Sequence, residues 1–172
     1  VWNTSGYESP FALELLDGVV DVYLSDIRYS SDEAARVYSD APDYVPVSRS
    51  ALREMHRQVG DLATDETGVA QRGLIVRHLV LPNGHAGTDE ALRFVAEELG
   101  ARTHVSLMAQ YYPACRAIEF PELARRITLE EWTRAVRVIE SAGLENGWVQ
   151  EYQEDVSTIA GTEIDADRAA SG

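Results

Sequence analysis

The stretch Leu74-Ile-Val-Arg-His-Leu-Val-Leu-Pro-Asn-Gly84 predicts a buried β-strand that ends in a proline–glycine turn. A strand buried on both faces reads as a nearly continuous run of Val, Ile and Leu. Arg77 and His78 interrupt this run, where an unpaired charge would cost several kcal/mol. Because successive side chains point to opposite faces of a strand, each of the two needs its own polar partner. Arg77 either pairs with an acid for structure or binds a ligand, and His78 is either a packed residue or a functional one.

Three further segments have the composition of strands that end in polar residues: Val1 to Tyr7, Val20 to Arg28 and His104 to Pro113. Helical patterns separate all four strands. Such alternation is typical of βαβ units, which form a parallel sheet with right-handed crossovers. The sequence therefore predicts an α/β fold.

The helices are predicted from their caps and their apolar periodicity. Ser9 precedes Pro10 at the start of a short helix, and Thr128 with Glu131 forms a capping box. The polar segment Asp61 to Gly73 is expected to be an irregular, solvated loop. The remaining predicted helices are Asp32 to Ser39 behind Ser31, Arg49 to Val59, Asp89 to Leu99 capped by Thr88, and the helix from Thr128 that ends at Gly143.

Composition excludes several classes of partner. The chain has 172 residues, and its 15 basic residues, all Arg, face 29 acids, giving a net charge of −14. Such a surface repels nucleic acid and anionic membranes, because phosphate binding needs clustered cations. No apolar run approaches the roughly 18 residues of a membrane helix. We therefore expect neither a nucleic acid nor a membrane as partner.

Cys115 is the only cysteine of the chain. One thiol forms no intrachain disulfide, which fits a reducing cytoplasm, and it cannot hold an iron–sulfur cluster, which needs several thiolates. The chain also begins with Val1 in the middle of a predicted strand. We therefore expect a cytoplasmic fragment of a longer protein, without cluster ligands of its own.

The polar residues at the strand ends are the candidate site. In barrel-type sheets the chemistry lies at the carboxyl ends of the strands. His104 lies at a strand start and is not a candidate. The residues at the carboxyl ends are Asn3 to Gly6, Asp26, Arg28, Pro82 to Gly84 and Gln110 to Tyr112.

Four strings of sequence, in this order, resemble the second half of radical S-adenosylmethionine (radical SAM) enzymes similar to pyruvate formate-lyase activating enzymes. They are Asn3-Thr-Ser-Gly-Tyr7, Arg77-His-Leu-Val-Leu-Pro82, Leu107-Met-Ala-Gln-Tyr-Tyr-Pro113 and Gly143-Leu-Glu-Asn-Gly-Trp-Val-Gln150. The resemblance implies that residues 1–152 are the C-terminal four β/α units of a partial (β/α)6 TIM-like barrel. Residues 153–172 are expected to be an acidic, disordered tail. The family's C-x-x-x-C-x-x-C motif would lie N-terminal to Val1.

The resemblance also implies a cofactor and its contacts. Asp26 and Arg28 match the acidic and basic positions around S-adenosylmethionine, with Arg28 where many relatives have Lys. Asn3 and Thr4, next to Ser5, match an Asp-Thr pair at a monovalent cation site, and Asn3 removes one negative charge from it. The remaining implied cofactor contacts are Arg77, His78, Met108, Gln110 and Tyr111.

The implied reaction is the reductive cleavage of S-adenosylmethionine at a 4Fe–4S cluster, giving a 5′-deoxyadenosyl radical that abstracts hydrogen. The implied partners are a protein substrate and an electron donor such as flavodoxin or ferredoxin, and the chain alone is expected to be inactive. One alternative is a metal-dependent barrel hydrolase that uses Asp26, His78 and His85. Another is a non-catalytic interaction domain, in which Asp26 and Arg28 are only a surface ion pair.

Overall fold

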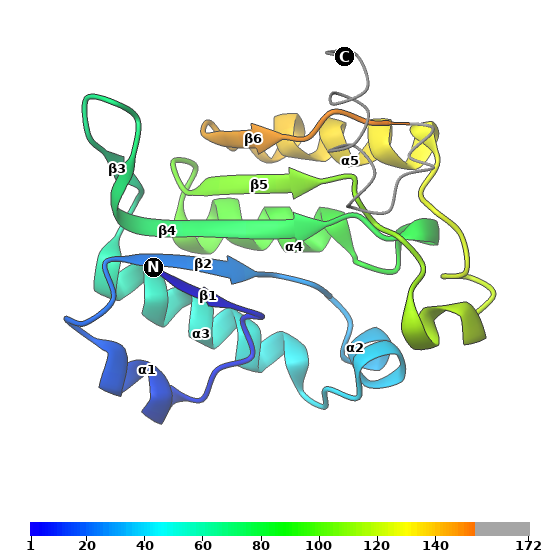
Figure 1. Cartoon of the computed structure of the whole chain (residues 1–172), viewed down its shortest axis with the longest axis horizontal. Helices are drawn as coiled ribbons and strands as arrows, with labels where there is room; N and C mark the ends of the chain where they lie inside the picture. The colour runs from blue at the N-terminus through cyan, green and yellow to red at the C-terminus, as the bar shows by residue number, and fades with distance from the viewer. Residues whose placement is uncertain (154–172) are drawn as a thin grey trace, which may run out of the picture.

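The computed structural model of the chain describes residues 1–153. As predicted, they form an α/β fold, but its sheet has six strands, whereas the sequence predicted four (Figure 1). Five strands are parallel and lie side by side in chain order, which is the arrangement of a partial TIM-like barrel. The predicted disordered tail lies, from residue 154 on, outside the described residues. The parallel strands are β1 (Trp2–Thr4), β2 (Val22–Asp26), β4 (Ala70–Leu79), β5 (His104–Met108) and β6 (Gly147–Val149).

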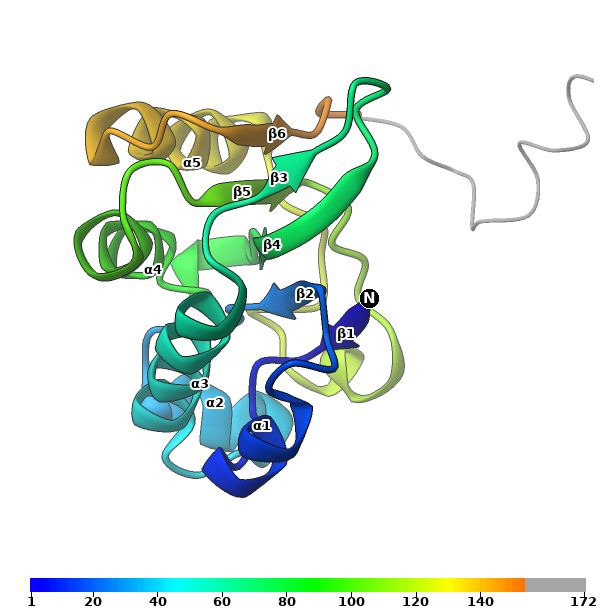
Figure 2. The same ribbon diagram turned by 90° about the vertical axis from the view of Figure 1, so that its left-hand side faces the viewer.

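The sheet has one covered and one open face. Figures 1 and 2 show the main helices packed behind the sheet, whereas no helix of residues 1–153 covers the face turned toward the viewer of Figure 1. The strands follow this asymmetry: Leu74, Val76 and His78 of β4 are buried, while the alternating residues Ile75 and Arg77 are only partly buried. The helices are α1 (Pro10–Leu16), α2 (Asp32–Ser39), α3 (Tyr44–Val59), α4 (Thr88–Phe94) and α5 (Leu129–Ala142).

Three predicted helix starts are confirmed. The Ser9 and Ser31 hydroxyls accept hydrogen bonds from the backbone N–H groups of the first turns of α1 and α2. Thr128 and Glu131 form the predicted capping box of α5, which ends at Gly143. Each cap satisfies a backbone N–H that has no partner within the helix, which is why short local patterns located these helices correctly.

Two predicted helix starts are wrong. Helix α3 begins at Tyr44 instead of Arg49, because Pro46 lies in the first turn, where its missing N–H breaks no helical hydrogen bond. The cap of α4 is Gly87 in a left-handed conformation, and no side chain bonds to the helix start. The Thr88 hydroxyl bonds to His78 instead. Beyond Phe94 the helix continues as a wider π-type turn over residues Val95–Leu99.

The segment predicted as an irregular loop is a β-hairpin. Strand β3 (Ala63–Thr64) pairs antiparallel with the first residues of β4. The Asp65 carboxylate closes the turn by accepting from the backbone N–H groups of Thr67 at 2.9 Å and Val69 at 3.0 Å. These strands were not predicted, because their exposed residues lack the apolar alternation that marks a strand.

Strand β6 is a second element that the sequence did not predict. Its three residues are all exposed, so it carries no hydrophobic pattern, and only its pairing with β5 identifies it. None of the helices in residues 1–153 is long and apolar enough to cross a membrane.

Candidate functional site

A pocket of about 390 Å³ lies at the carboxyl ends of β2, β4 and β5, on the open face of the sheet. Its position follows from the parallel strand order, which brings three strand ends to one edge. The pocket combines charged, aromatic and apolar side chains, as small-molecule sites do. Its lining residues are Asp26, Arg28, Tyr29, Arg77, Leu79, Leu81, Met108, Gln110 and Tyr111.

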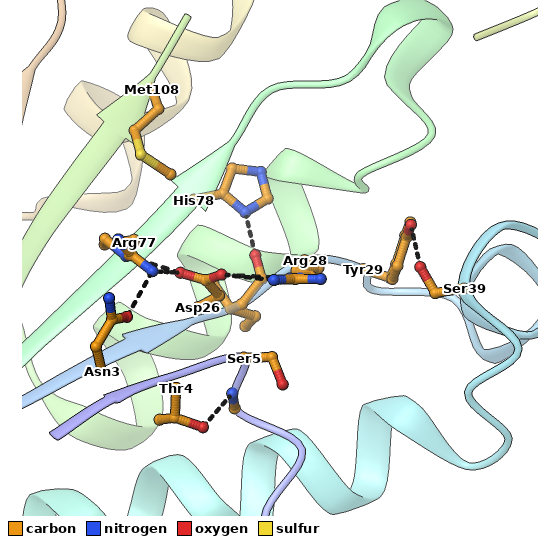
Figure 3. Close-up of polar contacts among 12 residues, drawn as sticks. Asn3, Thr4, Ser5, Asp26, Arg28, Tyr29, Ser39, Arg77, His78 and Met108 are labelled. Carbon is orange, nitrogen blue, oxygen red and sulfur yellow. Dashed lines mark hydrogen bonds and ion pairs between the residues drawn. The ribbon is translucent and has the colours of Figure 1, made fainter. Parts of the chain in front are cut away.

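Asp26 is the centre of the polar part of the pocket (Figure 3). Its Oδ1 accepts from Arg77 Nε at 2.7 Å, and its Oδ2 accepts from Arg28 Nη2 at 3.1 Å. The exposed fraction of the side chain is 13% for Asp26, 26% for Arg77 and 50% for Arg28. One carboxylate therefore lies between two guanidinium groups, which leaves this part of the pocket with one net positive charge.

Asn3 joins this network from the neighbouring strand. Its Oδ1 accepts from Arg77 Nη2 at 2.9 Å, so Arg77 links the ends of β1 and β2 (Figure 3). Arg77 and Asp26 are adjacent in the register of the two parallel strands β2 and β4. Both side chains point to the open face because they occupy equivalent positions of the pleat.

The structure decides which face Arg77 and His78 occupy. Arg77 faces the pocket, whereas His78 faces the helical layer and is completely buried. Its Nδ1 lies 2.7 Å from the Ile27 carbonyl oxygen, and its Nε2 lies 2.9 Å from Thr88 Oγ1. Both ring nitrogens are therefore hydrogen-bonded within the protein. The resemblance implied that His78 contacts the cofactor, but His78 does not line the pocket.

These two contacts define the state of the His78 ring. A carbonyl oxygen only accepts hydrogen bonds, so Nδ1 carries the proton and Nε2 accepts from the Thr88 hydroxyl. Burial lowers the pKa of His78 to about 4, against the opposing effect of the Ile27 carbonyl. The ring is thus neutral at pH 7 and holds the backbone between Asp26 and Arg28.

Thr4 and Ser5 lie beside the pocket instead of lining it. The Thr4 hydroxyl donates to the Glu8 carboxylate and accepts from the Gly6 N–H at 3.2 Å. Gly6 has a φ of 77°, and a Cβ there would lie 2.2 Å from the Asp26 carbonyl oxygen. Only glycine allows this turn to pack so closely against the end of β2.

Met108, Gln110 and Tyr111 form the wall of the pocket contributed by β5 and the loop that follows it. Gln110 Nε2 lies 3.7 Å from Met108 Sδ. The Tyr111 hydroxyl donates to the Leu123 carbonyl oxygen at 2.9 Å, and burial raises the pKa of this phenol. Tyr111 therefore presents its ring to the pocket while its hydroxyl fixes the loop.

Sequence reasoning missed three residues of the lining: Tyr29, Leu79 and Leu81. Tyr29 could have been predicted from the sequence, because it directly follows the candidate residue Arg28. Leu79 and Leu81 lie in the apolar run of β4 and just after it, where nothing distinguishes a pocket wall from core. Tyr44, whose hydroxyl contacts Arg28, gave no signal because it lies on a different element.

The metal-hydrolase alternative finds no support in the geometry. Within residues 1–153, no group of three or more His, Cys, Asp or Glu side chains could hold a metal ion. His85 instead packs against Tyr38, with Nδ1 3.4 Å from the phenol oxygen. Asp26, His78 and His85 therefore do not form the ligand cluster that this alternative requires.

Comparison by sequence identifies a relative but no matching family. No family model matches the chain. It is 31% identical over 146 residues to the uncharacterized protein MJ0674 of Methanocaldococcus jannaschii, a match that covers 84% of this chain and 39% of that protein. The chain thus spans about two fifths of the length of this relative.

Among solved structures, the chain is similar to a domain of pyruvate-formate lyase-activating enzyme from Bacteroides vulgatus. The TM-score is 0.59 at 11% sequence identity, and the match covers 87% of this chain and 79% of that one. At this identity the likeness shows the fold. The chain is therefore an α/β protein whose partial-barrel sheet is arranged as in a domain of that enzyme.

Proposed function

We propose that the chain is the S-adenosylmethionine-binding part of a radical SAM protein similar to pyruvate formate-lyase activating enzymes. The observation that carries this proposal is the Asp26 carboxylate held between Arg77 and Arg28 at the mouth of a strand-end pocket. The fold of the domain from the Bacteroides enzyme and the resemblance of the strand-end sequences support the same function.

The pocket fits the polar part of S-adenosylmethionine. Its volume of about 390 Å³ falls within the range of small-molecule sites, roughly 300–1,000 Å³. Arg28 is half exposed, so its free N–H groups are available to a ligand carboxylate while Arg77 keeps Asp26 in place. Asp26 in turn offers its oxygens to a ligand amine or ribose hydroxyl.

The apolar and aromatic part of the pocket fits the adenine. Leu79 and Leu81 supply apolar surface, and the rings of Tyr29 and Tyr111 border the same space. An adenine ring gains from such a slot through apolar burial and contact with aromatic rings. Met108, on the neighbouring strand β5, lines the same pocket and lies opposite Leu79 in the register of β4 and β5.

The residues of this chain do not fit a 4Fe–4S cluster. Cys115, its only cysteine, is exposed, and one thiolate cannot replace the several that a cluster needs. In the proposed parent protein, Asp26 and Arg28 would hold the cofactor, and a reduced cluster held by residues outside this chain would supply the radical chemistry for hydrogen abstraction. The part of this chain is to bind and orient the cofactor and to limit the access of water.

The proposal extends to the partners of the longer protein. A protein substrate and an electron donor such as flavodoxin or ferredoxin belong to the same hypothesis. Both follow from the family resemblance, whereas the pocket itself supports only the small-molecule ligand.

Calorimetric titration of the 172-residue chain with S-adenosylmethionine and S-adenosylhomocysteine tests the proposal. We expect saturable binding that Asp26→Asn weakens at least tenfold, because this variant keeps the shape of the side chain and removes its charge. Asp89→Asn is the matched control, since Asp89 forms an exposed ion pair with Arg93 on α4. Absence of binding, or equal binding by the Asp26 and Asp89 variants, would contradict the proposal.

A second experiment uses the longer protein after anaerobic reconstitution with iron and sulfide. Release of 5′-deoxyadenosine from S-adenosylmethionine should collapse with Asp26→Ala and persist with Asp89→Ala. Cluster absorbance and electron paramagnetic resonance show whether each variant still holds the cluster, so a binding defect is distinguished from a loading defect.

A further inference from the structure

Tyr44 does not line the pocket, but it connects two loops that lie beside the pocket. It is the first residue of α3 and only 2% of its surface is exposed. Its hydroxyl accepts a hydrogen bond from the backbone N–H of Arg28 at 2.8 Å and donates one to the Ser5 carbonyl oxygen at 3.3 Å. One phenol therefore joins the loop after β1 to the loop after β2.

The Tyr44 ring is itself fixed from two sides. Tyr7 stacks on it with ring centroids 5.8 Å apart, and Tyr29 meets it edge-on at 5.6 Å. Burial raises the pKa of Tyr44 to about 12, so the hydroxyl keeps the proton that it donates to Ser5. The hydroxyl can thus bridge both loops throughout the physiological pH range.

Together with β4, Tyr44 fixes three successive backbone groups next to Asp26. The Ile27 N–H donates to the Arg77 carbonyl oxygen at 2.9 Å, and the Ile27 carbonyl accepts from His78 at 2.7 Å. The Arg28 N–H donates to Tyr44 at 2.8 Å. The first two bonds come from the sheet, and only the third fixes the backbone at Arg28 itself.

We propose that Tyr44 is a positioning residue, which sets the place of the Arg28 guanidinium at the mouth of the pocket by holding the Arg28 backbone N–H. This inference rests on the proposed function, because it assigns to Arg28 the ligand carboxylate. Without the hydroxyl, the long Arg28 side chain would start from a mobile backbone. The geometry by which it reaches Asp26 and a ligand together would then be lost.

Tyr44→Phe removes the hydroxyl and retains both ring contacts. The matched control is Tyr23→Phe on β2. Tyr23 is also fully buried, and its hydroxyl donates to the Gln58 side chain of α3 at 2.6 Å, on the covered face of the sheet. Each variant loses one buried phenol hydroxyl between β2 or its loop and α3, but only Tyr44→Phe releases the Arg28 N–H.

Two readouts on the full chain decide the proposal. Hydrogen exchange followed by NMR should show the Arg28 amide exchanging at least tenfold faster in Tyr44→Phe and unchanged in Tyr23→Phe. Titration with S-adenosylhomocysteine should show an affinity about tenfold lower for Tyr44→Phe and within twofold of wild type for Tyr23→Phe. This pattern supports a positioning role, because a general loss of stability would affect both variants.

Other outcomes overturn either the positioning role of Tyr44 or the proposed function. An Arg28 amide that stays protected in Tyr44→Phe overturns the positioning role, and so does an equal loss of affinity in the two variants. A wild-type chain that binds neither S-adenosylhomocysteine nor S-adenosylmethionine overturns the proposed function. The exchange measurement needs no ligand and still decides whether Tyr44 holds the Arg28 backbone.

Discussion

Arg77 and His78 are neighbours on β4, yet they belong to two different regions of the molecule. Arg77 lies on the open face, partly exposed, and shares its hydrogen bonds with Asp26 and Asn3 at the pocket. His78 lies on the helix-covered face and is fully buried, and its two ring nitrogens are hydrogen-bonded to Ile27 and Thr88. The comparison separates a residue that lines the pocket from a residue that is buried behind it.

Substitution of His78 should therefore change mainly the stability of the fold, whereas substitution of Arg77 should change mainly the affinity for a ligand. Removing a buried side chain leaves its hydrogen-bond partners unpaired in a place that water does not reach, which lowers the stability of the fold. Removing a partly exposed charge at a pocket changes ligand affinity more than stability, because solvent can replace its contacts. The predictions below test this contrast, from the largest expected effect to the smallest.

His78→Leu should lower the free energy of unfolding by about 3 kcal/mol, because the Ile27 carbonyl and the Thr88 hydroxyl both lose their partner. Urea denaturation followed by circular dichroism measures the change. The control is His85→Leu, a partly buried residue at the surface, for which we expect a loss within about 1 kcal/mol. Equal losses in the two variants would show that the buried contacts of His78 add no more stability than those of a surface histidine.

The stability of the wild-type chain should fall as the pH decreases from 6.5 toward 4. His78 has a pKa of about 4 when folded, below its ordinary value of 6.5, so the unfolded chain binds the extra proton in this range. Its contribution is complete above pH 6.5 and decreases by up to about 3 kcal/mol as the pH falls through the folded pKa. Urea titrations at pH 7, 5.5 and 4.5 measure it.

His78→Leu is the control for this pH dependence and should show a much flatter curve between pH 6.5 and 4.5. Carboxyl groups with a lowered pKa, such as Glu131, have an ordinary value of 4.5 and lose their contribution only below it. A wild-type curve that is flat down to pH 4.5 would mean that the His78 pKa is not lowered by burial.

Arg77→Gln should weaken the binding of S-adenosylhomocysteine about tenfold, which corresponds to about 1.4 kcal/mol, while the free energy of unfolding changes by less than about 1 kcal/mol. Asp26 keeps Arg28 as a partner in this variant, which limits the loss of stability. Arg93→Gln removes an equal charge from the exposed side of α4 and serves as control. Calorimetry and urea denaturation of the same preparations give both quantities.

Thr88→Val should have the smallest effect, a loss of about 1 kcal/mol in the free energy of unfolding, because one neutral hydrogen bond to His78 is removed at nearly constant shape. Thr64→Val in the exposed strand β3 provides the comparison and should cost nothing measurable. A loss in Thr88→Val as large as in His78→Leu would show that Thr88, and not the Ile27 contact, is the main support.

Local patterns predicted the frame of the molecule well. The strands around Asp26 and Arg77, the helix caps at Ser9 and Ser31, and the capping box at Thr128 each depend on residues within a few positions of one another. The hairpin at Asp65 and strand β6 escaped prediction because their pairing partners, and not their own side chains, make them strands.

The sequence by itself determined the alternation of strands and helices and the concentration of polar residues at the strand ends. Both follow from short-range periodicity and from the chemistry of single residues. Only the tertiary structure decided that Arg77 faces the pocket while His78 faces the helices. It also decided that the Thr88 hydroxyl bonds to His78 and that the Tyr44 hydroxyl bonds to the backbone N–H of Arg28. The physical reason is distance along the chain: Arg77 and its partner Asp26 are 51 residues apart, and their pairing exists only once the sheet has formed.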